Sequence, residues 1–245
     1  MDETLAEAVE HHQQGKIESA INIYRRILEV QPDNLPALIN LGAALRQQKN
    51  PVQAEEYFRR AIKIDSEHTG IHFNLGNSLA DQGQLEDAIT CYREAIAIDP
   101  NFAAAHNNHG DALSRLNRFD DAIASFTHVL RIEPANAEAM NNLGNALKRQ
   151  GRLEDAVIWL TRASEINPRN PEIQNNLGNA LRDTGRLEGA VTCYEAAIAI
   201  DPNHAEAHCL NAFSLLAQGV FARGWEELLF WFRNLVSERS TYSEN

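Results

Sequence analysis

Apolar residues recur along the chain at spacings of three and four, which is the period of one face of an α-helix. Leu38, Leu41 and Leu45 show this spacing, and a second stretch with the same spacing follows after a short polar turn. The residue in that turn is Gly in five of seven cases, and Gly suits the left-handed conformation that ends a helix. Asp-Pro-Asn at 99–101 then ends a second helix. The pattern predicts pairs of amphipathic helices along the whole chain.

The helix pair repeats every 34 residues without gaps, so the 245 residues hold seven units and seven further residues. Counted from Met1, position 20 of the unit is Ala in six units, and position 24 is Tyr, Phe or Leu in all seven. Position 32 is Pro in five units. The expected repeats are 1–34, 35–68, 69–102, 103–136, 137–170, 171–204 and 205–238. Residues 239–245 are expected to be a polar tail.

This unit resembles the tetratricopeptide repeat (TPR), a helix–turn–helix unit of the same period. The resemblance rests on the Leu-Gly segments that begin at residues 41, 75, 143 and 177, and on positions 20 and 24. It implies an all-α fold, a right-handed α-solenoid of seven repeats that forms a single stack over 1–238. Small residues at positions 8 and 20 are expected to let the paired helices approach closely beside the residue at position 24. The first helices would then line a concave groove.

Composition narrows the choice of partners. The net charge is −12, from 22 basic and 34 acidic residues, which argues against binding a phosphate backbone or an anionic membrane surface. No apolar run is long enough to span a bilayer. The three cysteines are an odd number without motif spacing, which fits a reducing compartment. We expect a cytoplasmic protein with no nucleic-acid and no membrane partner.

Asparagines recur at two positions that face the groove in TPR proteins. Position 6 is Asn40, Asn74, Asn108, Asn142 and Asn176, and position 9 is Asn77, Asn145 and Asn179, with Asp111 in the fourth unit. A carboxamide both donates and accepts, so a row of them can bind the backbone of an extended peptide of any sequence. The position-6 row resembles the asparagine ladder in the repeat region of O-linked N-acetylglucosamine transferases, which implies a peptide site. The alternative is that these asparagines are a common TPR feature with solvated amides.

Charge in the groove does not select a ligand of one sign. Position 5 is never Lys, so the clamp by which some TPR proteins hold a C-terminal carboxylate is not expected. Basic residues such as Arg46 and Lys148 alternate with acidic residues such as Asp81 and Glu206.

The sequence predicts neither catalysis nor a metal site. Histidine pairs such as His106 with His109 have no third ligand of suitable type nearby. His109 replaces the Leu of position 7 and is expected to be buried or half-buried. Cys91 and Cys193 share position 23, which indicates a packing role. No phosphate-binding loop, dinucleotide-binding turn or nucleophile elbow is present, so we expect no enzyme activity and no cofactor.

The seventh unit differs from the others at its second helix. Positions 25 and 26 are mostly polar elsewhere but are apolar here, and 225–236 is apolar nearly all round, which predicts burial. The seven residues of the tail are too few to cap this surface. We therefore expect self-association through five residues, Trp225, Leu229, Phe230, Trp231 and Phe232. Loss of a following domain is the alternative, because the segment from Gly224 also resembles the end of bacterial repeat arrays that lead into glycosyltransferase-like domains.

Three functions remain open at this point. The first is a non-catalytic interaction scaffold that binds a partner's peptide segment in the groove and forms a homo-oligomer through its C-terminal repeat. The second is the substrate-recruiting TPR segment of an O-linked N-acetylglucosamine transferase-like system. The third is an assembly module with no groove ligand.

Overall fold

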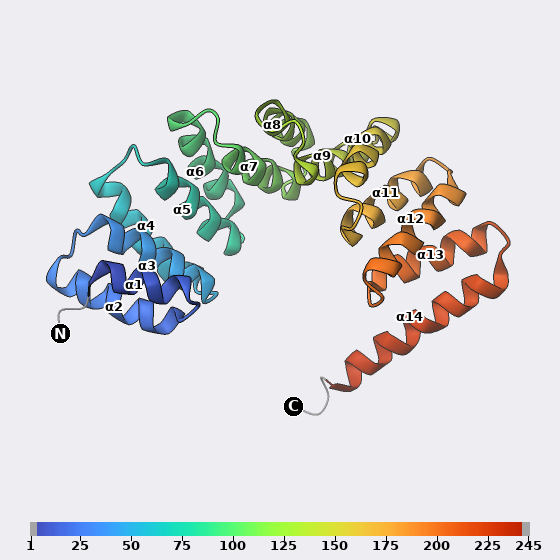
Figure 1. Cartoon of the computed structure of the whole chain (residues 1–245). Coiled ribbons are helices and arrows are strands. Elements are labelled where there is room, and N and C mark those ends of the chain that lie inside the picture. The colour runs from blue at the N-terminus through green and yellow to red at the C-terminus, as the bar shows by residue number, and fades with distance from the viewer. Residues whose placement is uncertain (1–3, 242–245) are drawn as a thin grey trace. The chain divides into compact units, whose positions relative to one another are not determined.

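The computed structural model of the chain describes residues 4–241, with side chains as far as Phe232. The described residues form fourteen α-helices and no strand (Figure 1). The helices are α1 (Leu5–Gln13), α2 (Ile17–Val30), α3 (Leu35–Gln47), α4 (Pro51–Ile64), α5 (Thr69–Asp81), α6 (Leu85–Ile98), α7 (Ala103–Arg115), α8 (Phe119–Ile132), α9 (Ala137–Arg149), α10 (Leu153–Ile166), α11 (Pro171–Asp183), α12 (Leu187–Ile200), α13 (Ala205–Ala217) and α14 (Phe221–Thr241). The all-α class and the helix–turn–helix pairs are confirmed.

The chain divides into two compact units, Met1–Ile132 and Glu133–Asn245, and each is described by itself. In both units the two helices of a repeat pack on each other, and the second helix also packs on the first helix of the next repeat. First helices contact one another as well, α1 to α3, α3 to α5 and α5 to α7 in one unit, and α9 to α11 and α11 to α13 in the other. First helices therefore form one layer of each unit, and second helices form the other. A single stack over 1–238 stays a prediction.

The turns within the repeats follow the expected backbone geometry. Gly83 has a φ of 77°, in the left-handed region, and glycines at the same position of four other repeats have φ between 75° and 86°. In the other two repeats Lys49 and Asn117 stand in place of Gly, and both have a φ of 60°. The turn is therefore imposed by the packing of the helix pair, and Gly is only the residue that adopts it at least cost.

Close packing within a repeat depends on position 8. A Cβ atom added to Gly76 would lie 2.6 Å from Cε1 of Tyr92 at position 24, and one added to Gly178 would lie 2.6 Å from Cε1 of Tyr194. Ala88, at position 20, is fully buried. The expected close approach is confirmed, and the structure shows that the missing side chain makes room for the residue at position 24.

The two ends differ from the inner repeats. Helix α1 has 9 residues, against 13 in α3, and buries only Ala8. Helix α14 continues to Thr241, so the expected polar tail begins inside a helix. Position 32 is Val236 there, where five other repeats have the Pro that ends their second helix. Within the described range, none of the helices combines the length and the hydropathy needed to cross a membrane.

Candidate functional site

The position-6 asparagines share one environment. Asn40, Asn74 and Asn108 lie on α3, α5 and α7 of one unit, and Asn142 and Asn176 lie on α9 and α11 of the other. All five side chains are half-buried. In each unit, we call the surface of the first helices that carries them the inner face. Partial burial limits the motion of an amide and still leaves part of it accessible, which a backbone-binding site requires.

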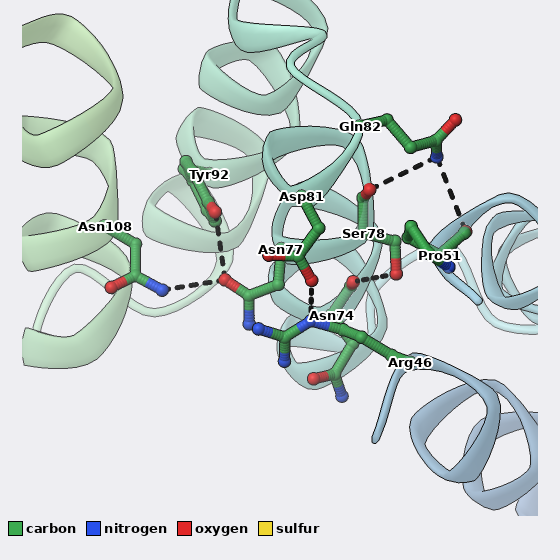
Figure 2. A network of polar contacts seen from close by, with 9 residues as sticks. All are labelled: Arg46, Pro51, Asn74, Asn77, Ser78, Asp81, Gln82, Tyr92 and Asn108. Carbon is green, nitrogen blue, oxygen red and sulfur yellow. Dashed lines mark hydrogen bonds and ion pairs between the residues drawn. The ribbon is translucent and has the colours of Figure 1, made fainter. Parts of the chain in front are cut away.

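A buried tyrosine organises this face in the third repeat. Tyr92 Oη on α6 donates to Asn77 Oδ1 on α5 over 2.9 Å, and Asn108 Nδ2 on α7 donates to the same oxygen over 2.7 Å (Figure 2). Tyr92 and Asn77 are 2% and 5% exposed, so this bond is shielded from water. Burial raises the pKa of Tyr92, which keeps the phenol protonated as a donor at neutral pH. Three helices are thus joined at one oxygen atom.

The structure changes the role expected of two position-9 asparagines. Asn179 is 6% exposed, and Tyr194 Oη donates to its Oδ1 over 2.9 Å, as Tyr92 does to Asn77. The Oδ1 atoms of Asn77 and Asn179 are therefore occupied within the fold and do not lie open to a peptide. Asn145 is half-buried, and position 24 of its repeat is Leu160, which has no hydroxyl to offer. Asp111 is exposed and lies 3.9 Å from Arg115 Nη1.

A second chain of amides crosses the other unit. Asn176 Nδ2 on α11 donates to Asn141 Oδ1 on α9 over 2.9 Å. Asn141 Nδ2 then lies 3.4 Å from Asn142 Oδ1 on the same helix. Neighbouring first helices are therefore linked by side-chain amides here too, through position 5 instead of position 9.

These contacts fix which atoms the inner face can present. Asn108 has its Nδ2 engaged with Asn77, and Figure 2 shows its Oδ1 turned away from that bond. Asn77 has its Oδ1 engaged, and its Nδ2 lies on the side of Arg46 in the same view. An acceptor on one helix and a donor on the next are thus held in fixed orientations. Side chains held in this way lose less conformational entropy when they bind a ligand than mobile side chains do.

Charges on the inner face pair with each other. Arg46 Nε on α3 lies 2.6 Å from Asp81 Oδ2 on α5, and both side chains are more than a third exposed. Lys148 on α9 is half-buried, and burial lowers its pKa. The mixed charge that the sequence indicates is therefore partly neutralised between neighbouring repeats, and it favours no ligand of one sign.

Helix α14 carries an apolar surface that the described part of the chain leaves uncovered. Phe221, Trp225, Leu229 and Phe232 recur at helical spacing on α14 and are 63%, 55%, 56% and 50% exposed. We call these four residues the apolar stripe. Their burial, which the sequence predicts, does not occur within a single chain.

The two other predicted residues of α14 lie partly against the chain. The Phe230 ring packs on His208 with centroids 4.2 Å apart, although the side chain is still 40% exposed. Trp231 is half-buried.

Histidines and cysteines do not form a reactive centre in the part of the chain that is described. No group of three potential ligands there has the geometry to hold a metal ion. The three cysteines form no disulfide, and burial raises the pKa of Cys91 and of Cys193 to about 11, so both remain thiols at neutral pH. His109 is half-buried, as expected.

Sequence reasoning missed the tyrosine hydroxyls at position 24. A signal for them exists, because Tyr at position 24 coincides with Asn at position 9 in the third and sixth repeats. The two positions come within hydrogen-bonding distance only when the helices are packed, so the sequence alone does not show that they interact.

Three features together define a tetratricopeptide-repeat protein. They are helix pairs that recur every 34 residues, small residues at positions 8 and 20, and a layer of first helices that carries the asparagines. The family model described as the Cilia and flagella-associated protein 70 C-terminal domain matches residues 2–225, and the chain belongs to this TPR family. No curated protein matches the sequence.

Solved TPR structures share the fold. A tetratricopeptide repeat protein from Parabacteroides merdae is 17% identical with a TM-score of 0.76, and the match covers 94% of this chain and 91% of that chain. YrrB, described as "a TPR protein with an unusual peptide-binding site", is 19% identical with a TM-score of 0.62, over 75% of this chain and 95% of that chain. MamA is 23% identical with a TM-score of 0.62, over 66% and 88%.

At these identities the similarity shows the fold alone. None of the proteins named here is described as an enzyme. The resemblance to O-linked N-acetylglucosamine transferase-like proteins stays a prediction.

Proposed function

We propose that this chain is a non-catalytic interaction scaffold whose inner face binds an extended segment of a partner protein. The observation that carries the proposal is the set of amides held in place between neighbouring first helices. Membership in the TPR family supports the scaffold role, and the peptide-binding site attributed to YrrB, which has the same fold, supports the choice of ligand. The location that we propose is the cytoplasm.

The geometry of an extended peptide fits the repeat. Packed helices lie about 8–10 Å apart, and an extended chain advances about 3.3 Å per residue. One asparagine per repeat therefore meets the peptide at about every third residue. Each hydrogen bond contributes about 0.5–1.5 kcal/mol net, so the amides supply weak binding that is independent of sequence. Side-chain contacts have to supply the specificity.

Removing two asparagines tests this proposal. Asn108→Ala with Asn142→Ala is expected to weaken the binding of unrelated extended peptides to a similar extent, as measured by fluorescence anisotropy. Asn22→Ala is the matched control, because Asn22 is an exposed asparagine on α2. Unchanged affinity in a double variant that keeps its helicity would show that these amides do not bind the peptide.

We also propose that the chain self-associates through the C-terminal repeat. The support is the apolar stripe, whose four large side chains are each at least half exposed. In the sixth repeat the residue at the position of Trp225 is Val191, which is 8% exposed. Trp225 is therefore exposed at a position that is covered in the sixth repeat. A second copy of this chain covers it in our proposal.

Light scattering at micromolar concentration tests the association. The wild-type chain is expected to be larger than a monomer, and Trp225→Glu with Leu229→Glu is expected to be a monomer. Phe230 and Trp231, replaced by polar residues, give a second variant with the same expected result. Phe213→Ser is the control, since Phe213 is 54% exposed but lies on α13. A wild-type monomer contradicts the proposal.

The alternative function is recruitment of substrates for a glycosyltransferase. The row of position-6 asparagines is the observation that favours it. Glycan transfer to a bound peptide, on addition of a catalytic partner, is the result it requires. If no such transfer occurs, the glycosyltransferase alternative is contradicted and the scaffold proposal is kept.

A further inference from the structure

The fourth repeat contains a pocket on the side of the second helices. The pocket has a volume of about 450 Å³ and is lined by Arg93, Ile96, Ala97, His106, His109, Ala124, Ser125 and His128. These residues come from α6, α7 and α8, all within one unit. The position-6 asparagines do not line it, so the pocket is separate from the site proposed above.

The pocket exists because this repeat has small residues where others have large ones. Ala124 and Ser125 occupy positions 22 and 23, which are Ile158 and Trp159 in the fifth repeat. Ala97, from the preceding second helix, stands where the next repeat has Arg131. The lining also differs at His109, which replaces the Leu found at position 7 in four repeats. An imidazole is therefore one of the polar groups in an open pocket whose exposed lining is mainly apolar.

The hydrogen bonds of His109 determine which of its nitrogens carries the proton. Ser125 Oγ lies 3.0 Å from the carbonyl oxygen of Asp121, which can only accept, so the hydroxyl donates there. His109 Nδ1 lies 2.9 Å from the same Oγ, and we therefore assign Nδ1 as the donor. Nε2 then carries a lone pair. It has no hydrogen-bond partner among the described residues, and it is not one of the enclosed polar atoms.

Burial keeps this imidazole neutral, so Nε2 remains an acceptor at neutral pH. The pKa of His109 is lowered to about 4 by burial first and then by His106, Arg93 and Arg118, while Asp121 acts in the opposite direction. A metal ion also binds neutral imidazole, but no suitable group of three ligands exists in the described part of the chain. The lone pair is therefore available to a hydrogen-bond donor of a ligand.

The walls of the pocket favour a flat aromatic group. His106 and His128 stack with centroids 4.1 Å apart and planes inclined by 24°. Their Nε2 atoms lie 3.0 Å and 3.2 Å from the carbonyl oxygen of Pro100, which holds both rings in place. Arg93 also lines the pocket and adds a cation. A guanidinium interacts most favourably with the face of an indole ring.

We propose that this pocket binds the indole of a tryptophan side chain from a partner protein, with the indole N–H donated to His109 Nε2. Indole combines the three properties that the pocket selects, namely an apolar plane, one N–H donor and an electron-rich face. The volume falls in the range of sites for small ligands, about 300–1,000 Å³. The pocket is thus a specificity site for a partner that is independent of the inner face.

Titration of the full chain with indole and 1-methylindole tests the hydrogen bond. Amide resonances of residues 109, 124 and 125 are expected to shift with saturation in nuclear magnetic resonance spectra. 1-Methylindole is expected to bind about 2- to 10-fold more weakly, because it cannot donate. In His109→Leu, which restores the residue of four other repeats, the two probes are expected to bind equally. Equal affinity in the wild type overturns the proposal.

Two further arms test the pocket and the source of the indole. Ser125→Trp places the residue of the fifth repeat in the pocket and is expected to abolish binding, while helicity and thermal melting show that the chain is folded. If Ser125→Trp does not fold, the comparison of indole with 1-methylindole in His109→Leu is the test of the proposal. N-acetyltryptophanamide is expected to bind and N-acetylphenylalaninamide to bind more weakly. Binding of free indole without binding of N-acetyltryptophanamide would refute a side chain as the ligand.

Discussion

Two tyrosines at the same repeat position give a matched test of how the structure uses a buried hydroxyl. Tyr92 and Tyr24 both occupy position 24 and are 2% and 0% exposed. Tyr92 Oη donates to Asn77 Oδ1, whereas Tyr24 Oη is enclosed without a partner among the described residues. Position 9 of the first repeat is Val9, which offers no acceptor. Phe occupies position 24 in the second and fourth repeats, so the ring alone fits this site.

The expected effects of Tyr→Phe therefore differ in size and in sign. Tyr92→Phe removes a buried hydrogen bond and is expected to lower the free energy of unfolding by about 0.5–1.5 kcal/mol. The lower part of that range is favoured because Asn77 Oδ1 keeps the bond from Asn108 Nδ2. Tyr24→Phe removes a hydroxyl that is buried without a partner, so it is expected to be neutral or stabilising by up to about 1 kcal/mol.

Urea denaturation followed by circular dichroism measures the difference, and hydrogen exchange localises it. Tyr92→Phe is expected to speed exchange in α5 and α6, since neighbouring repeats carry most of the coupling in such arrays. Tyr194→Phe is expected to act like Tyr92→Phe, because Tyr194 makes the same bond to Asn179. Equal destabilisation by Tyr92→Phe and Tyr24→Phe would refute the reasoning.

Three further predictions concern charge and packing. Burial lowers the pKa of His109 to about 4 in the folded chain, so the unfolded chain takes up this proton at a higher pH than the folded chain does. The free energy of unfolding is therefore expected to fall by up to about 3 kcal/mol as pH drops from 6.5 to 4. His109→Leu is expected to flatten this dependence in urea titrations at several pH values. Gly189→Asp, whose Cβ would lie 3.3 Å from Leu181 Cδ1, is expected to raise the free energy of unfolding by about 0.5–1 kcal/mol once Leu181 adjusts, because Asp121 and Asp155 at the same position pair with Arg118 and Arg152. Arg186→Ala should remove much of that gain, as thermal melting would show. Gly144→Ala, whose Cβ would lie 2.6 Å from Leu160 Cγ, is expected to cost about 1–3 kcal/mol in chemical denaturation, and a second substitution, Leu160→Ala, should relieve the clash.

The helix pairs were predictable because their signals are local. Apolar spacing of three and four, the residue at the turn and Pro after the second helix each act within a few residues. The packing of position 8 on position 24 was predictable as well, because a small residue on one helix of a pair leaves space that a large residue on the other helix fills. The end of α14 at Thr241 was not predictable, because Val236 stands at the position where other repeats have Pro, and Val does not end a helix.

The candidate site was predictable only in part. The position-6 row was visible as a repeated residue type, and the structure places all five asparagines half-buried on first helices. The burial of Asn77 and Asn179 was not visible, because it depends on a hydroxyl from the following helix, fifteen residues further along the chain. A side chain that faces a groove on a helical wheel can still turn toward its neighbour when a stronger partner is buried there.

The sequence by itself determined the repeat, the fold class and the residue types on each helix face, because helix periodicity is a property of neighbouring residues. Only the tertiary structure decided which amides are already bonded, where an imidazole keeps an open lone pair, and which apolar side chains of α14 remain uncovered. Each of these depends on atoms from two or three helices meeting at distances of about 3–4 Å, and no local pattern encodes such distances. The same repeat position can therefore hold a satisfied hydroxyl at Tyr92 and an unsatisfied one at Tyr24.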